Sequence, residues 1–133
     1  HLAKTNNHDL GFYMNEMNTE NNTESINLSE IYKLRRAKLA TYLSENGLAA
    51  AVFVDNEEHR CPSLRYFTGH PSDAILIITK NGKSVLCPWD INIANQKAFV
   101  ETIVPYTKFD RNKIKAVEGL LKNLSMMLSL NTM

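Results

Sequence analysis

The feature that most constrains the fold is a continuous apolar segment at residues 74–79, Ala-Ile-Leu-Ile-Ile-Thr. Its residues are mainly β-branched, and no polar side chain recurs at alternate positions. A strand of this composition must be covered on both faces. We therefore predict that residues 74–79 form a central strand of a sheet.

Asn81 and Gly82 separate this segment from a second apolar run at residues 85–87. An Asn-Gly pair tolerates the two positive φ angles of a type I′ turn, so the pattern predicts a tight hairpin. The register that such a turn implies pairs Lys80 with Lys83, Thr79 with Ser84, Ile78 with Val85, Ile77 with Leu86 and Leu76 with Cys87. Pro88 has no amide hydrogen and is expected to end the ladder.

Further elements are expected on the amino-terminal side of the hairpin. Ser29 as an N-cap and Gly47 as the residue after the last turn predict a helix over residues 30–46. The alanine-rich apolar residues 48–54 predict a buried strand. Residues 64–70 are predicted to be a loop that leads into the central strand.

On the carboxy-terminal side, residues 90–99 predict a short amphipathic helix, and residues 101–104 predict a strand that Pro105 ends. Residues 112–130 predict a long helix, because apolar side chains recur at intervals of three and four. These side chains are Ile114, Val117, Leu120, Leu121, Leu124 and Leu128. Together the elements predict an α/β, three-layer domain, in which a mixed β-sheet with a central hairpin is flanked by helices.

The charge of the chain excludes some partners. It has 15 Lys and Arg against 14 Asp and Glu, a formal net charge of +1. Binding to nucleic acid or to a membrane surface through bulk charge is therefore not expected. Arg35 and Arg36 are predicted to lie on a solvated helix flank, with Arg35 at the edge of the apolar face. The carboxylates and histidine of residues 55–59 are of metal-binding types, but a solvated loop explains them better.

Three features bear on the compartment and the domain organisation. No apolar run approaches the roughly 20 residues that span a bilayer, and no signal-peptide pattern is present, so a cytoplasmic location is expected. Cys61 and Cys87 lack C-x-x-C spacing and are expected to be free thiols. Residues 1–27, rich in Asn, Thr and Glu, predict a mostly flexible leader, and residues 28–133 predict the folded domain.

The sequence Tyr66-Phe67-Thr68-Gly69 resembles the Tyr-(Leu/Phe)-Thr-Gly-Phe motif of the creatinase and Xaa-Pro peptidase family. The order of helix, alanine-rich strand, motif, hairpin ending at Asp90, and helix is similar to the amino-terminal domain of that family. The resemblance covers residues 31–109 and implies a ribonuclease H-like fold. There are two departures. His70 follows the glycine in place of an aromatic residue, and Asp90 does not begin the Asp-x-Arg-Tyr sequence that many members show.

The resemblance implies that catalysis belongs to a different domain. In the family, a carboxy-terminal domain binds two divalent metal ions (manganese, cobalt or zinc) through two Asp, one His and two Glu, and hydrolyses the bond before proline. Nothing in this sequence matches that domain, so we expect a chain cut before it, with no catalytic residue, metal site or cofactor of its own. The amino-terminal domain is implied to form homo-oligomer contacts, as a dimer, and to cover an active site that takes proline-containing peptides.

His70, Trp89, Asp90 and Arg65 are the candidates for contact with substrate or with a neighbouring subunit. His70, beside Pro71, is expected to be exposed and to titrate near neutrality, with an ordinary loop histidine as the alternative. Trp89, the only tryptophan, suits an interface or covers the end of the hairpin. Asp90 alternatively caps the following helix.

Two other functions stay open. The domain could be a protein-binding module that keeps a peptidase-like fold without catalysis, or it could belong to a creatinase-type amidinohydrolase. The sequence that follows residue 133 would separate these functions, because the peptidase and creatinase branches need five metal ligands there.

Overall fold

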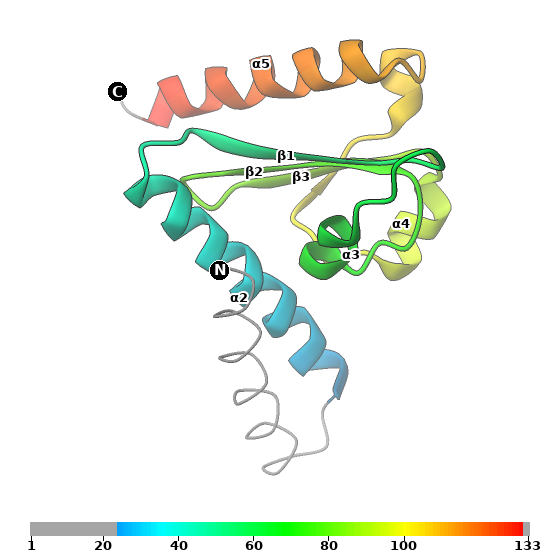
Figure 1. Ribbon diagram of the computed structural model, residues 1–133, viewed down its shortest axis with the longest axis horizontal. Coiled ribbons are helices and arrows are strands. Elements are labelled where there is room, and N and C mark those ends of the chain that lie inside the picture. Colours follow the sequence, from blue (N-terminus) through cyan, green and yellow to red (C-terminus); the bar gives the residue numbers. More distant parts are fainter. Residues whose placement is uncertain (1–23, 132–133) are drawn as a thin grey trace.

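The computed structural model describes residues 24–131 as an α/β domain built on one four-stranded sheet (Figure 1). In chain order the elements are α2 (Glu24–Glu45), β1 (Ala50–Asp55), α3 (Pro62–Thr68), β2 (Ala74–Thr79), β3 (Ser84–Pro88), α4 (Ile91–Lys97), β4 (Thr102–Ile103), the 3₁₀ turn η1 (Tyr106–Phe109) and α5 (Lys113–Asn131). The strand order is β1-β2-β3-β4, with antiparallel neighbours except for the parallel pair β3 and β4. The predicted mixed sheet is confirmed. Of the predicted leader, residues 1–23 lie outside the described part.

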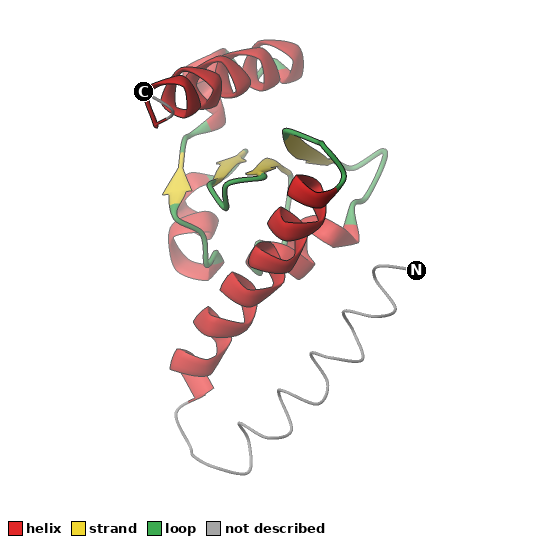
Figure 2. Cartoon of the chain, turned by 90° about the vertical axis from the view of Figure 1, so that its left-hand side faces the viewer, coloured by secondary structure: helices red, strands yellow, loops and turns green. Residues whose placement is uncertain are grey.

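Helices cover both faces of the sheet (Figures 1 and 2). Helix α5 lies on one face, and α2, α3 and α4 lie on the other. Alternate residues of β2 serve the two cores: Leu76 and Ile78 pack with α2 and α3, whereas Ile75 and Ile77 pack with α5. All six residues of β2 are buried, which confirms the predicted central strand.

The predicted register of the hairpin is wrong by one residue. The observed pairs are Ala74 with Pro88, Ile75 with Cys87, Leu76 with Leu86, Ile77 with Val85 and Ile78 with Ser84. Gly82 has a φ of 85°, but Asn81 is not among the residues with positive φ, so the turn is not type I′. The Gly82 N–H donates to the Thr79 carbonyl at 3.0 Å, as in a type I turn followed by a glycine bulge.

The apolar pattern could not have set this register. Both β2 and β3 are buried along their whole length, so a slip of one residue places apolar side chains on both faces again. The turn therefore decides the pairing. Pro88 does not end it either, because the Trp89 N–H donates to the Asp73 carbonyl at 3.0 Å.

Helix α2 begins at Glu24, so Ser29 lies inside it and is not its N-cap. The carboxy-terminal end is as predicted. Gly47 has a φ of 68°, and beyond it the Leu48 N–H donates to the Leu43 carbonyl at 2.8 Å, which closes the last turn.

Residues 64–70, predicted to be a loop, lie mostly in helix α3. Pro62 occupies the start of this helix, where its missing N–H costs nothing. Gly69 ends the helix in the left-handed conformation, with its N–H donating to the Arg65 carbonyl at 2.7 Å. Leu64 and Phe67 are buried in the core. A helix of seven residues is too short for its apolar spacing to be recognised in the sequence.

Gly69→Ala is expected to lower the free energy of unfolding by about 2 kcal/mol, and Gly82→Ala by about 1 kcal/mol. Both glycines have positive φ. A Cβ on Gly69 would also meet the Lys97 carbonyl and the Tyr32 ring at 3.2 Å, whereas a Cβ on Gly82 meets nothing within 4 Å. Urea unfolding of the two variants measures the difference. Equal losses would show that the contacts around Gly69 contribute nothing.

The exposure of strand β1 and of helix α5 differs from prediction. Strand β1 was predicted to be buried, but it lies at the sheet edge, and its Val52 is 41% exposed. In α5, Ala116 and Leu120 face the core, whereas Ile114, predicted on the apolar face, is 66% exposed. None of the helices in residues 24–131 is long and apolar enough to cross a membrane.

Candidate functional site

A polar pocket of about 700 Å³ opens at the end of the sheet where β1 and β3 finish and β2 begins. The last residue of β1, Asp55, faces Ala74 at the start of β2, and Ala74 faces Pro88 at the end of β3. The loops at these strand ends form the walls. Carboxylates, aromatic rings and cations line the pocket together: Glu57, Glu58, Asp73, Asp90, Trp89, Tyr106, Arg111 and Lys113.

Trp89 forms an aromatic surface in this pocket. The indole is 45% exposed. Its ring meets Tyr106 edge-to-face, with centroids 5.5 Å apart, and the Arg111 guanidinium lies 4.5 Å from its centroid. Both contacts are attractive, so they hold the indole in one orientation. Trp89 therefore presents a preorganised aromatic face to the pocket.

Arg111 reaches the indole through an unusual turn. Among the described residues other than glycine, only Asp110 and Arg111 have positive φ, at 56° and 52°. The Arg111 N–H donates to the Tyr106 carbonyl at 3.1 Å, and Asp110 pairs with Lys115 at 3.2 Å. This conformation costs about 1–2 kcal/mol per residue and is found disproportionately at functional sites.

Asp90 has the structural role that the sequence left open. Its Oδ1 accepts the N–H groups of Asn92 at 2.9 Å and Ile93 at 3.2 Å, which caps α4. The same residue lines the pocket next to Trp89. Capping fixes the Asp90 carboxylate in place, so the pocket has a rigid negative group beside its aromatic surface.

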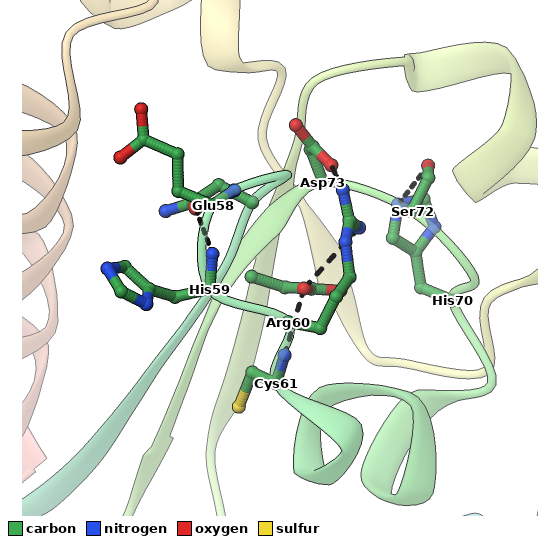
Figure 3. A network of polar contacts seen from close by, with 9 residues as sticks. Glu58, His59, Arg60, Cys61, His70, Ser72 and Asp73 are labelled. Atoms are coloured by element: carbon green, nitrogen blue, oxygen red, sulfur yellow. Dashed lines mark hydrogen bonds and ion pairs between the residues drawn. The ribbon is translucent and has the colours of Figure 1, made fainter.

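Arg60 links the carboxylates of Asp55 and Asp73 (Figure 3). Its guanidinium lies 2.8 Å from Asp73 and 3.5 Å from Asp55. Asp55 is buried and also accepts the Cys61 N–H at 2.9 Å. These bonds fix the loop that leaves β1 against the start of β2.

Among the described residues, the carboxylates at this end of the sheet form no metal site. Residues 24–131 contain no group of three or more His, Cys, Asp or Glu side chains that could hold a metal ion. Asp55 is turned inward to Arg60 and Cys61, whereas Glu57, Glu58 and His59 are exposed. The described residues therefore do not fit the two-metal centre that the family resemblance implies for a whole enzyme.

His70 was predicted to be exposed, and this prediction is wrong. The side chain is 0% exposed. Gly69 turns the chain back at the end of α3, and the His70 N–H donates to Thr68 Oγ1 at 3.1 Å. The imidazole Nε2 lies 3.3 Å from the hydroxyl of Ser72, a pocket-lining residue, so His70 supports the wall from behind (Figure 3).

Burial lowers the pKa of His70 from its ordinary value. A hydrogen bond with the Asp73 backbone and the carboxylates of Asp55, Asp90 and Asp73 oppose this effect. The imidazole Nδ1 has no hydrogen-bond partner among the described residues. His70 is thus buried behind the pocket wall rather than exposed in a loop.

The four residues selected from the sequence therefore do not lie in one site. Trp89 and Asp90 lie together in the pocket, His70 lies behind Ser72, and Arg65 is exposed on α3 and does not line the pocket. Sequence reasoning missed Tyr106 and Arg111. One signal was available. If the strand at residues 101–104 pairs in parallel with β3, the residues after Pro105 lie at the same end of the sheet as Trp89.

The fold and pocket define a class: a mixed-sheet α/β domain with a polar site at its strand ends and no metal-binding cluster among the described residues. Residues 35–130 match the family described as the creatinase/prolidase N-terminal domain. The chain belongs to that family.

Solved structures and curated proteins were also compared. One similar structure is the N-terminal, creatinase/prolidase-like domain of a candidate metallopeptidase from Corynebacterium diphtheriae, with 23% identity and a TM-score of 0.44. The similarity covers 56% of this chain and 60% of that one. No curated protein gave a significant match.

Proposed function

We propose that this domain is the non-catalytic amino-terminal domain of an Xaa-Pro aminopeptidase or dipeptidase. In this proposal a carboxy-terminal domain with two divalent metal ions hydrolyses the bond before proline in short peptides. The domain described here forms oligomer contacts and covers the active site. The observation that supports the proposal is a preorganised pocket around Trp89 in a chain of the creatinase/prolidase N-terminal domain family.

The pocket has the chemistry of a cover rather than of a catalyst. Its central group is the exposed face of Trp89, which offers a large apolar contact at little cost in conformational entropy. Charges of both signs surround it, with Asp90 on one side and Arg111 over the ring. Such a surface can contact a short peptide or the rim of another domain.

A cytoplasmic location is part of the proposal. Cys61 and Cys87 are both free thiols. Cys87 is fully buried, and burial raises its pKa to about 11, so it stays protonated and unreactive. Free thiols are ordinary in a reducing compartment.

We expect the 133-residue chain to hydrolyse no Xaa-Pro dipeptide, even with added manganese or cobalt.

In a longer form that carries the carboxy-terminal domain, Trp89→Ala should raise KM for Xaa-Pro peptides about tenfold, because a contact of roughly 1.4 kcal/mol is lost. The value of kcat should change little. Steady-state kinetics on Xaa-Pro dipeptides measures both constants.

Arg65→Ala is the matched control, since Arg65 is exposed and outside the pocket. Turnover by the 133-residue chain alone would contradict the proposal. Absence of the five metal ligands after residue 133 would favour a protein-binding module, and activity on creatine instead of Xaa-Pro peptides would favour the amidinohydrolase.

A further inference from the structure

The outer edge of β1 exposes unpaired backbone groups. The Lys80 N–H donates to the Ala49 carbonyl at 3.0 Å, and in the register of β1 and β2 these two residues lie opposite each other. Hydrogen-bonded and non-hydrogen-bonded pairs alternate along an antiparallel ladder. The N–H and C=O groups of Ala50, Val52 and Val54 therefore point away from β2, and no described residue bonds to them.

This edge carries none of the features that usually keep a strand from pairing. Residues 50–54 contain no proline, no charged residue and no bulge. Val52 is 41% exposed, and Leu48, just before the strand, is 47% exposed. A long uncharged edge of this kind is a template for another strand.

The edge is also complementary to itself. If a second copy lies antiparallel with Val52 opposite its own symmetry mate, Ala50 falls opposite Val54 of the other copy. All outward-pointing groups then face one another, and each such pair can exchange two hydrogen bonds. No like charges meet, because Asp55 falls opposite Ala49. A closed two-fold contact of this type satisfies both edges at once.

We propose that two copies of this protein associate through their β1 edges, which joins the two sheets into one continuous sheet across a two-fold axis at Val52. This inference deepens the proposed function, because it names the surface that makes the oligomer contact. It does not depend on the identity of the substrate.

Val52→Pro tests the backbone pairing. Proline is tolerated on an edge strand when its nitrogen faces outward, so β1 should keep its pairing with β2. The loss of both symmetry-related N–H donors should weaken the dimer about tenfold or more in sedimentation equilibrium. Val52→Thr keeps the N–H and a β-branched shape, and it should leave the dimer nearly unchanged. A protein that is monomeric at all concentrations, or a dimer equally stable in the proline variant, would overturn the proposal.

Cysteine cross-linking tests the register independently, in a Cys61→Ser background. Val52→Cys should form an intermolecular disulfide on oxidation, since the Cα atoms of such a pair lie about 5.5 Å apart, within disulfide range. Val54→Cys should not cross-link with itself but should do so when mixed with Ala50→Cys. A dimer without these cross-links would remove the β1 edge and leave an oligomer through another surface. Unchanged kinetics of Trp89→Ala would instead contradict only the active-site role.

Discussion

Replacing Arg36 with methionine is expected to lower the free energy of unfolding by about 3 kcal/mol. Arg36 is 8% exposed, although it carries a guanidinium. Its Nη1 donates to the Phe67 carbonyl at 2.8 Å and to the Phe99 carbonyl. Burial lowers the pKa of Arg36, with Glu101 opposing, but an arginine stays charged in proteins. Methionine fills similar space and leaves both carbonyls without this donor.

Lys33→Met is the matched control for that substitution. Lys33 is exposed one turn earlier on the same helix, so the same change there should alter stability by less than about 0.5 kcal/mol. Arg36→Lys should recover part of the loss, because an ammonium can reach one carbonyl but lacks the planar fork of the guanidinium. Urea unfolding monitored by circular dichroism gives all three values. A loss below about 1 kcal/mol for Arg36→Met would show that the two bonds add little.

The prediction of a solvated flank for Arg35 and Arg36 fails for a tertiary reason. Helix α2 passes the carboxy-terminal end of α3, where the last carbonyls have no partner within their own helix. Arg35 donates to the Tyr66 carbonyl at 2.8 Å, and its guanidinium lies 4.1 Å from the centroid of the Tyr66 ring. Both arginines therefore complete the end of a neighbouring helix. The periodicity of α2 carries no information about that neighbour.

The same division separates the predicted part of the fold from the rest. The central strand and the end of α2 at Gly47 depend on local composition and local backbone geometry, and both were predicted. The register of β2 and β3 depends on the φ of Asn81, and the exposure of β1 depends on its place at the edge. Neither the φ of Asn81 nor the position of β1 in the sheet can be read directly from a single sequence.

The pocket shows this division on a smaller scale. Trp89 and Asp90 were selected because they directly follow an apolar strand, and the structure places both in the pocket. Tyr106 and Arg111 reach the same indole from a segment that the sequence separates from it. His70 was predicted to be exposed because it lies beside Pro71 in a loop, but packing directs the chain after Gly69 into the core.

We expect the protein to lose stability as the pH falls below about 6.5, and we expect His70 to be a main cause. Burial lowers the pKa of His70 in the folded state from the ordinary histidine value of about 6.5. At a pH between the pKa of His70 in the folded chain and its pKa in the unfolded chain, the unfolded chain binds a proton that the folded chain does not. The free energy of unfolding therefore decreases as pH decreases. One such group contributes a slope of at most about 1.4 kcal/mol per pH unit.

His70→Phe should remove this contribution, because phenylalanine fills a similar volume and does not titrate. The comparison uses slopes, so a constant loss from the missing contact with Ser72 does not affect it. His59→Gln is the matched control, because it removes an exposed histidine instead of the buried one. Urea midpoints measured across that range give the slopes. An unchanged slope in His70→Phe would mean that His70 gains a proton in the folded state as readily as in the unfolded one. The carboxylates of Asp55, Asp73 and Asp90 would then outweigh its burial.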